Sequence, residues 1–187
     1  MTRTFNTRMA FRTMGALLLI EAVFMTLALG VSLWYGEADS GIFLLSTIIT
    51  LLAGVIGLMV GRRAESRMGE REGYVIVAMV WVVFSAFGLL PYYLSGQVNS
   101  ITDAWFERMS GFTTTGATII PDLNVITHGL LFWRSLTQWI GGTGIIVLSI
   151  AILPIFGLNG MQLYAAEVSG LTYEKVSPRI ADTAKMM

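Results

Sequence analysis

The sequence predicts an all-α membrane protein, in which an N-terminal transmembrane hairpin is followed by a second helix pair with a polar insertion. Of the 187 residues, 55% are hydrophobic and only 13% are charged, whereas a soluble domain carries about 25% charged residues. The charges are clustered, and the apolar runs between them reach about 20 residues, the length that crosses a bilayer. The chain has no cysteine and one histidine, which excludes disulfides and thiolate metal sites.

The first two apolar runs form the expected hairpin. Residues 1–12 carry three arginines and no acid. The run that follows is too long for the core of a signal peptide, so we expect a retained anchor helix. The first span is expected at 15–34 and the second at 42–60. The spacing from Gly57 to Gly61 favours close helix contact, and packing within the chain is favoured over dimerisation.

The third apolar run lies between two polar stretches. Residues 62–73 hold four arginines diluted by three glutamates, which favours a cytoplasmic loop set by topology over a binding surface for a partner. A third span is expected over 74–94. Ser100 then caps a short helix, with Asp103 as the reciprocal acid of a capping box, and this helix is expected to end near Gly111.

The segment after this short helix, Thr113-Thr114-Thr115-Gly116-Ala117-Thr118, cannot continue it. Consecutive threonines lose side-chain freedom against the preceding turn, and Gly116 can adopt backbone angles closed to other residues. By composition alone an ordinary loop is the commoner outcome. Irregular backbone at membrane depth, however, is tolerated only where protein buries it or where it lines a watery cavity. A helix that ends at such a strand between two spans indicates an ion selectivity filter, in which carbonyls replace the water shell of a cation.

The fourth apolar run, 129–153, is expected to be the second helix of this pair. Gly141, Gly142 and Gly144 interrupt its middle, so a bend or a close approach of another helix is expected there. Together with the third span and the Thr/Gly segment, this run completes a helix–pore loop–helix, potassium-channel-like repeat.

The distribution of basic residues predicts the orientation. Ten of the twelve lysines and arginines lie in 1–12, 62–73 or the polar tail 154–187, and the other two are Arg108 and Arg134. The basic side of a membrane protein is cytoplasmic. The N-terminus is therefore expected in the cytoplasm, and the Thr/Gly segment is expected to enter the membrane from the outside.

Three stretches resemble the TrkH family of bacterial potassium uptake proteins, in the Trk/Ktr/HKT superfamily, and they follow the family's order. SGFTTTGAT at 110–118 resembles the first pore loop. WRSLTQWIGG at 133–142, continued by GIIV at 144–147, is the second stretch. The third is AEVSG at 166–170, followed by SPRIA at 177–181 and TAK at 183–185.

This resemblance implies potassium transport across the bacterial inner membrane, with the chain supplying one quarter of a carbonyl-lined filter. It places potassium ligands at Thr114 and Thr115, with Thr113 and Gly116 completing the filter strand. Glycine at the Gly116 position goes with potassium preference, and serine goes with sodium permeation in plant relatives. The resemblance also implies a homodimer in the full-length form and a cytoplasmic, nucleotide-binding regulatory subunit of the TrkA type. The apolar spans imply contact with membrane lipid. No nucleic acid partner is expected, because the formal net charge is zero.

The expected organisation has four parts. They are an N-terminal region with an extra hairpin over 1–61, a cytoplasmic loop over 62–73, the first repeat over 74–153 and a cytoplasmic linker toward a next repeat over 154–187. Family members carry four such repeats in one chain, so this chain is expected to be an N-terminal fragment of a Trk-type uptake protein. Two alternatives remain open: a non-conducting membrane scaffold or subunit, and a single-repeat homotetrameric cation channel. An enzyme is excluded, because neither glycine-rich stretch has the strand, helix and lysine of a phosphate loop.

Charged residues near the expected spans need partners. Glu21 lies inside the first span, where a charge is costly, and a structural hydrogen bond to another helix is favoured over contact with the ion. Arg134 either snorkels to the outer interface or supports the pore by bracing the short helix through Glu107, and both interpretations carry equal weight. Glu107 would otherwise line an outer vestibule, where the neighbouring Arg108 would offset its field.

Overall fold

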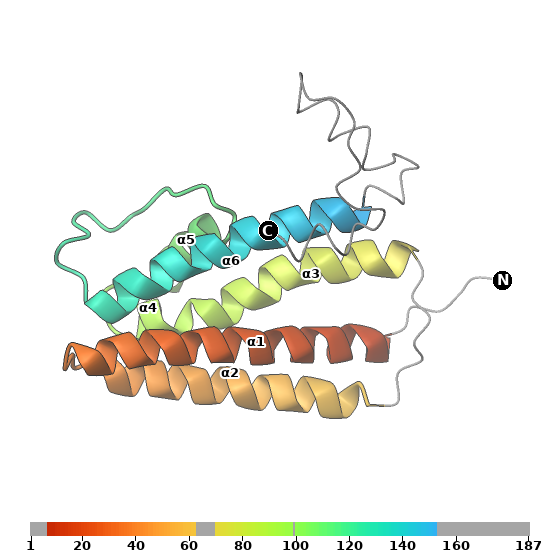
Figure 1. Ribbon diagram of the computed structural model, residues 1–187, viewed down its shortest axis with the longest axis horizontal. Helices are drawn as coiled ribbons and strands as arrows, with labels where there is room; N and C mark the ends of the chain where they lie inside the picture. The colour runs from red at the N-terminus through yellow and green to blue at the C-terminus, as the bar shows by residue number, and fades with distance from the viewer. Residues whose placement is uncertain (1–6, 63–69, 99, 153–187) are drawn as a thin grey trace, which may run out of the picture. The chain divides into compact units, whose positions relative to one another are not determined.

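The computed structural model describes residues 7–62, 70–98 and 100–152, and this part of the chain is all-helical, as predicted (Figure 1). The helices are α1 (Thr7–Trp34), α2 (Ser40–Val60), α3 (Glu70–Gly88), α4 (Leu90–Leu94), α5 (Ile101–Phe112) and α6 (His128–Ile152). The chain divides into two compact units, Met1–Ile146 and Val147–Met187, and the contacts below belong to the first. Most of the predicted cytoplasmic loop and the predicted linker 154–187 lie outside the described residues.

α1 and α2 form the predicted hairpin and lie side by side along their length (Figure 1). Glycines allow their backbones to approach closely. A Cβ added at Gly57 would lie 2.8 Å from the Cα of Gly15, and one added at Gly61 would lie 2.6 Å from the Cα of Arg12. The prediction that Gly57 and Gly61 serve packing within the chain is confirmed.

Three helical stretches are long and apolar enough to cross a membrane: Thr7–Trp34, Ser40–Val60 and Val75–Leu94. They correspond to the first three predicted spans. Large hydrophobic side chains are exposed along α2 from Leu44 to Val60, as expected of a helix in contact with lipid. Within the described residues α6 does not meet the same criterion, so the fourth span stays a prediction.

The third span is divided, whereas the sequence predicted one helix over 74–94. α3 ends at Gly88 and α4 begins at Leu90. Pro91 lies in the first turn of α4, where its missing N–H costs no helical hydrogen bond, whereas in an unbroken helix it would leave the carbonyl four residues earlier without a partner. The break therefore has a local cause in Pro91.

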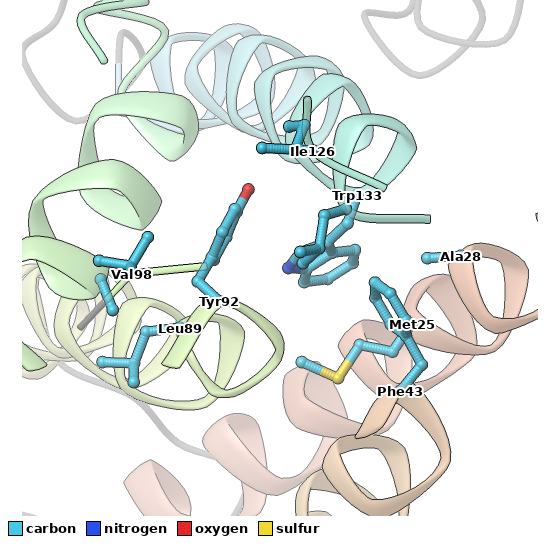
Figure 2. Close-up of a cluster of buried hydrophobic side chains, with 10 residues drawn as sticks. Met25, Ala28, Phe43, Leu89, Tyr92, Val98, Ile126 and Trp133 are labelled. Carbon is cyan, nitrogen blue, oxygen red and sulfur yellow. The ribbon is translucent and has the colours of Figure 1, made fainter. Parts of the chain in front are cut away.

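A cluster of buried hydrophobic side chains joins the hairpin to the later helices (Figure 2). Its members are Met25, Ala28, Phe43, Leu89, Tyr92, Val98, Ala104, Ile126, Leu130 and Trp133. Trp133 is fully buried, and its indole N–H donates a hydrogen bond of 3.0 Å to the Gly88 carbonyl. The cluster thus holds the start of α6 against the α3–α4 break.

The turn between α1 and α2 is bound to the start of α6. Glu37 accepts hydrogen bonds from the backbone N–H groups of His128 at 2.7 Å and Gly129 at 3.0 Å, so it caps α6. Desolvation raises the pKa of Glu37, but the hydrogen bonds from Gly129 and His128 outweigh it, and the pKa lies below its usual value. Asp39 accepts a further hydrogen bond from the Thr127 hydroxyl.

Candidate functional site

α5 delivers the chain to the Thr/Gly segment. The Ser100 hydroxyl accepts a hydrogen bond of 3.2 Å from the Thr102 N–H, which confirms the predicted cap, although no reciprocal bond from Asp103 occurs among the described residues. The helix ends at Phe112, one residue beyond the predicted Gly111. Its C-terminal end carries roughly half a negative charge and lies directly beside the segment that follows.

The backbone after α5 alternates in the sign of φ. The φ angle is −79° at Thr113, 58° at Thr114 and 76° at Gly116, and Thr115 is not among the positive-φ residues of the described chain. Positive φ is a genuine outlier for a β-branched residue such as Thr114, and outliers of this kind gather at functional sites.

Three carbonyls of this segment accept no hydrogen bond within the described part of the chain: those of Thr114, Thr115 and Thr118. The two carbonyls between Thr115 and Thr118 are engaged. The Gly116 carbonyl accepts from Arg134 Nη2 at 3.1 Å, and the Ala117 carbonyl accepts from the Ser110 hydroxyl at 2.6 Å. The free oxygens therefore include those of both residues assigned as ligands from the sequence, whereas the oxygen of Gly116 is already used.

The threonine side chains differ in their surroundings. The Thr113 hydroxyl donates a hydrogen bond of 2.9 Å to the Met109 carbonyl and lies 2.8 Å from the Thr115 hydroxyl oxygen. Thr113 is half-buried, whereas Thr114 and Thr115 are exposed. Thr113 thus braces the end of α5.

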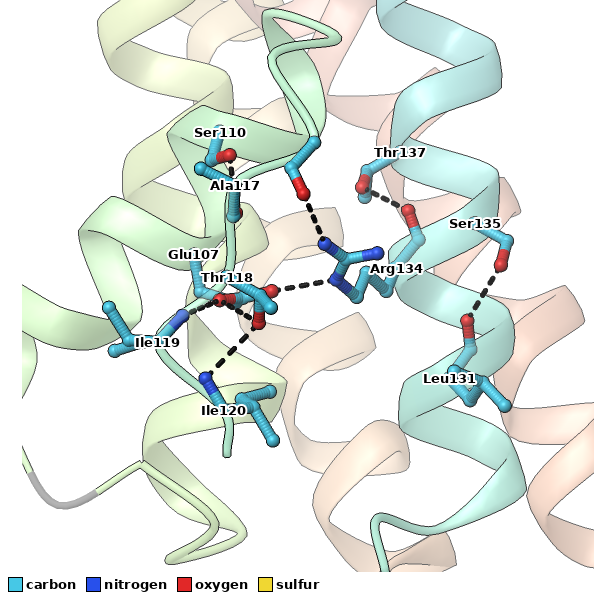
Figure 3. A network of polar contacts seen from close by, with 11 residues as sticks. Glu107, Ser110, Ala117, Thr118, Ile119, Ile120, Leu131, Arg134, Ser135 and Thr137 are labelled. Atoms are coloured by element: carbon cyan, nitrogen blue, oxygen red, sulfur yellow. Dashed lines mark hydrogen bonds and ion pairs between the residues drawn. The ribbon is translucent and has the colours of Figure 1, made fainter. Parts of the chain in front are cut away.

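A buried carboxylate and a guanidinium hold the segment from both sides (Figure 3). Glu107 is fully buried and accepts from Arg134 Nε at 2.7 Å, from the Thr118 hydroxyl at 2.9 Å and from the Ile119 N–H at 3.1 Å. Arg134 reaches across to the Gly116 carbonyl. The sequence left two interpretations of Arg134 open, snorkelling to the interface or bracing the short helix through Glu107. The structure contains the contact with Glu107. The expectation of a vestibule-lining Glu107 is wrong, because the side chain has no exposed surface.

α5 and α6 cross at two glycines. A Cβ added at Gly141 would lie 2.7 Å from the Phe112 carbonyl carbon, and one added at Gly111 would lie 2.7 Å from the Thr137 hydroxyl oxygen. The close approach predicted near 141–144 is therefore located at Gly141. Nothing lies within 4 Å of a Cβ added at Gly144.

A second ion pair lies deeper in the protein. Glu21 Oε1 and Arg108 Nη2 are 2.8 Å apart, and both side chains are fully buried. The hydrogen bond predicted from Glu21 to another helix is confirmed. The role expected of Arg108, offsetting the field of Glu107 in a vestibule, is wrong, because Arg108 faces the hairpin. No signal in the sequence pairs residues so far apart.

The groups at the end of α5 that could contact a cation are mainly backbone and hydroxyl oxygens. Among the described residues no group of three or more His, Asp or Glu side chains could hold a metal ion. A cation at the Thr/Gly segment would therefore be bound by carbonyl and hydroxyl oxygens. Such ligands suit hard monovalent ions without a formal anion in the site.

Comparison with known proteins gives consistent matches. Residues 42–187 match the TrkH family, described as "Cation transport protein". The chain is 43% identical over 178 residues to the Trk system potassium uptake protein TrkH of Salmonella typhimurium, covering 94% of this chain and 37% of that protein. Its counterpart in Vibrio parahaemolyticus is 40% identical over 182 residues, covering 96% and 38%.

A solved structure matches as well. The crystal structure of the potassium transporter TrkH from Vibrio parahaemolyticus aligns with a TM-score of 0.78 and 36% sequence identity, covering 96% of this chain and 36% of that chain. The chain therefore spans a little over a third of the length of the relatives that it matches.

Proposed function

This chain belongs to the TrkH family of cation transport proteins, and we propose that it supplies one quarter of a carbonyl-lined potassium selectivity filter. It is a multi-pass membrane protein of a transporter family, not of an enzyme family. In the proposal α5 is the pore helix and residues 113–118 form the filter strand. Potassium is the transported ion, as the names of the relatives support.

The free carbonyls of Thr114 and Thr115 carry this proposal. They follow the negative end of a helix dipole and lie in a segment whose φ angles alternate in sign. A dehydrated potassium ion needs a shell of several such oxygens, and a filter supplies them as rigidly held dipoles. Thr113 and Gly116 complete the strand, and Gly116 contributes its backbone angle while its carbonyl is held by Arg134.

Glu107 and Arg134 are the proposed pore support. Their contacts fix the strand at Gly116, Thr118 and Ile119, beyond the two proposed ligand residues. The pair has no net charge, so it holds the strand without adding a strong repulsive or attractive field for the passing cation.

The surroundings of this quarter-filter are proposals that rest on the resemblance to the family. They comprise three further repeats in the same assembly, a homodimer, a cytoplasmic nucleotide-binding regulatory subunit of the TrkA type, and the bacterial inner membrane as location. The proposed orientation has a cytoplasmic N-terminus, which rests on the distribution of basic residues.

Gly116→Ser tests the filter assignment in a hybrid transporter, in which residues 1–187 replace the matching first part of Vibrio parahaemolyticus TrkH. Gly116 has a φ of 76°, and a non-glycine residue loses about 1 kcal/mol or more at such an angle. We expect the preference for potassium over sodium to fall by up to roughly fivefold, the ratio given by a difference of about 1 kcal/mol between the two bound ions. Thr127→Ser, outside the strand, should leave it unchanged. The measurement is uptake in mixed potassium and sodium at equal surface expression.

The same experiment separates the alternatives. Unchanged selectivity of the Gly116→Ser hybrid would show that Gly116 is only a turn residue and that the filter lies elsewhere. A hybrid that inserts normally but moves no potassium would favour the scaffold. Growth of a potassium-uptake-deficient strain at limiting potassium, supported by the 187-residue chain alone, would favour the single-repeat homotetramer.

The orientation is tested by single cysteines, which the chain otherwise lacks. In intact cells an impermeant thiol reagent should label Asn124→Cys and spare Ser66→Cys. Permeabilised cells serve as the control, since both positions should then react. The reverse pattern in intact cells would overturn the proposed orientation.

A further inference from the structure

The Glu21–Arg108 ion pair joins the hairpin to the pore helix. Glu21 is on α1 and Arg108 is on α5, and neither side chain has exposed surface. The Arg108 guanidinium carbon lies 5.1 Å from the centre of the Phe112 ring and 5.0 Å from that of Trp133. Two aromatic faces and one carboxylate therefore surround the cation.

The site is shaped to hold an arginine. A Cβ added at Gly88, the last residue of α3, would lie 2.6 Å from Arg108 Cζ and 2.7 Å from Glu21 Oε1. Any side chain at this position would displace the ion pair. The carbonyl of the same glycine accepts the Trp133 indole N–H, so the ring beside Arg108 is itself held in place.

We expect the ion pair to add little to the stability of the fold by itself, because several of its polar atoms have no partner in the described part of the chain. Arg108 Nε, Arg108 Nη1 and Glu21 Oε2 are buried without a hydrogen-bond partner among the described residues. Buried pairs with unsatisfied atoms are often matched or exceeded in stability by apolar residues of similar volume. The best-attested use of such groups is to specify one arrangement among several.

Arg108 is close to the proposed filter along the chain. It lies one helical turn before Phe112, the last residue of α5, and the two side chains are in contact. The Phe112 ring stacks on Phe84 at a centroid distance of 5.4 Å, and its carbonyl faces Gly141. A rotation or axial shift of α5 at Arg108 would therefore move Thr113 and the residues after it.

We propose that the N-terminal hairpin is a positioning element for the selectivity filter, and that it acts through the Glu21–Arg108 pair. The carboxylate fixes the depth and rotation of α5, and α5 in turn places the free carbonyls of Thr114 and Thr115. The inference rests on the proposed function, because it gives the hairpin a role in ion discrimination. Glu21 and Arg108 touch no ion in this account.

The test uses the same hybrid transporter with three variants. Glu21→Met/Arg108→Met removes the pair without leaving a buried charge, and Glu21→Gln leaves Arg108 uncompensated. Met25→Ala is the control, because Met25 is a fully buried residue one turn further along α1 and its loss creates a cavity without a charge change. Each is measured for potassium and sodium uptake, for thermal stability and for amide hydrogen exchange over residues 113–119.

We expect the double variant to fold and to lose about two- to thirty-fold in potassium preference, the range of coupling through packed side chains. Amide exchange at 113–119 should rise with it. Met25→Ala should lower the melting temperature but leave the potassium preference and the amide exchange at 113–119 unchanged. If Glu21→Gln fails to fold, the double variant alone tests whether the ion pair positions residues 113–119. Normal selectivity and exchange in the folded double variant would overturn the inference. Absence of transport by the unmodified hybrid would refute the proposed function instead. In that case amide exchange at 113–119 would still test whether the ion pair positions this segment.

Discussion

Arg134→Met is expected to abolish selective potassium uptake by the hybrid transporter and to lower its folded fraction. Glu107 is fully buried and Arg134 is its cationic partner, and removal of one partner of a buried pair costs about 3–5 kcal/mol. The same change releases the Gly116 carbonyl from its hydrogen bond. Uptake in mixed potassium and sodium and the melting temperature in detergent measure the two effects.

Two companion variants separate charge from geometry. Arg134→Lys keeps the positive charge, but a single ammonium lacks the fork that reaches Glu107 and the Gly116 carbonyl together. We expect it to restore most of the folded fraction with reduced selectivity. Glu107→Gln/Arg134→Met leaves no buried charge and should fold, but it should not select potassium. Wild-type selectivity in Arg134→Met or in Glu107→Gln/Arg134→Met would contradict the bracing role.

Gly141→Ala is expected to have a comparably large effect for a steric reason. A Cβ there would lie 2.7 Å from the Phe112 carbonyl carbon and closer still to its oxygen, and both belong to backbone that cannot rotate away. Overpacking of this kind costs about 1–3 kcal/mol. Because Phe112 immediately precedes the proposed filter strand, we expect transport to fall sharply together with the melting temperature.

Gly144→Ala is the matched control on the same helix. A Cβ at this position meets nothing within 4 Å, and alanine is favoured over glycine in a helix by about 1 kcal/mol. The Gly144→Ala hybrid should therefore transport normally and melt no lower than the parent. Equal uptake by the two alanine variants would show that the α5–α6 crossing tolerates separation and does not position the strand.

The features that the sequence predicted well are set by neighbouring residues. The Ser100 cap, the end of α5 within one residue and the hairpin with its glycine contacts all follow from local propensity and spacing. The Thr/Gly segment is likewise non-helical, as the threonines and Gly116 require. Local rules act over one or two helical turns, which is why they succeed here.

The features that the sequence did not predict depend on distant partners. Arg108 is 87 residues from Glu21, and periodicity carries no information over that distance. The break after Gly88 was missed because the hydrophobic run continues through Pro91. Likewise, only the packed structure shows that Arg134 occupies the carbonyl of Gly116, 18 residues away.

The long-range ties of the hairpin have a consequence for biogenesis. The hairpin precedes α3 to α6 in the chain, so it is made before them. Its glycine-to-glycine contacts are internal, so it can close as soon as α2 enters the bilayer. Two acidic residues of the hairpin pair with residues that are synthesised later. Glu21 pairs with Arg108, 87 residues further along the chain, and Glu37 binds the start of α6, 91 residues further along. Loop-closure entropy grows only slowly over such lengths. We therefore expect the hairpin to form early and to offer Glu21 and Glu37 as docking points for α5 and then α6.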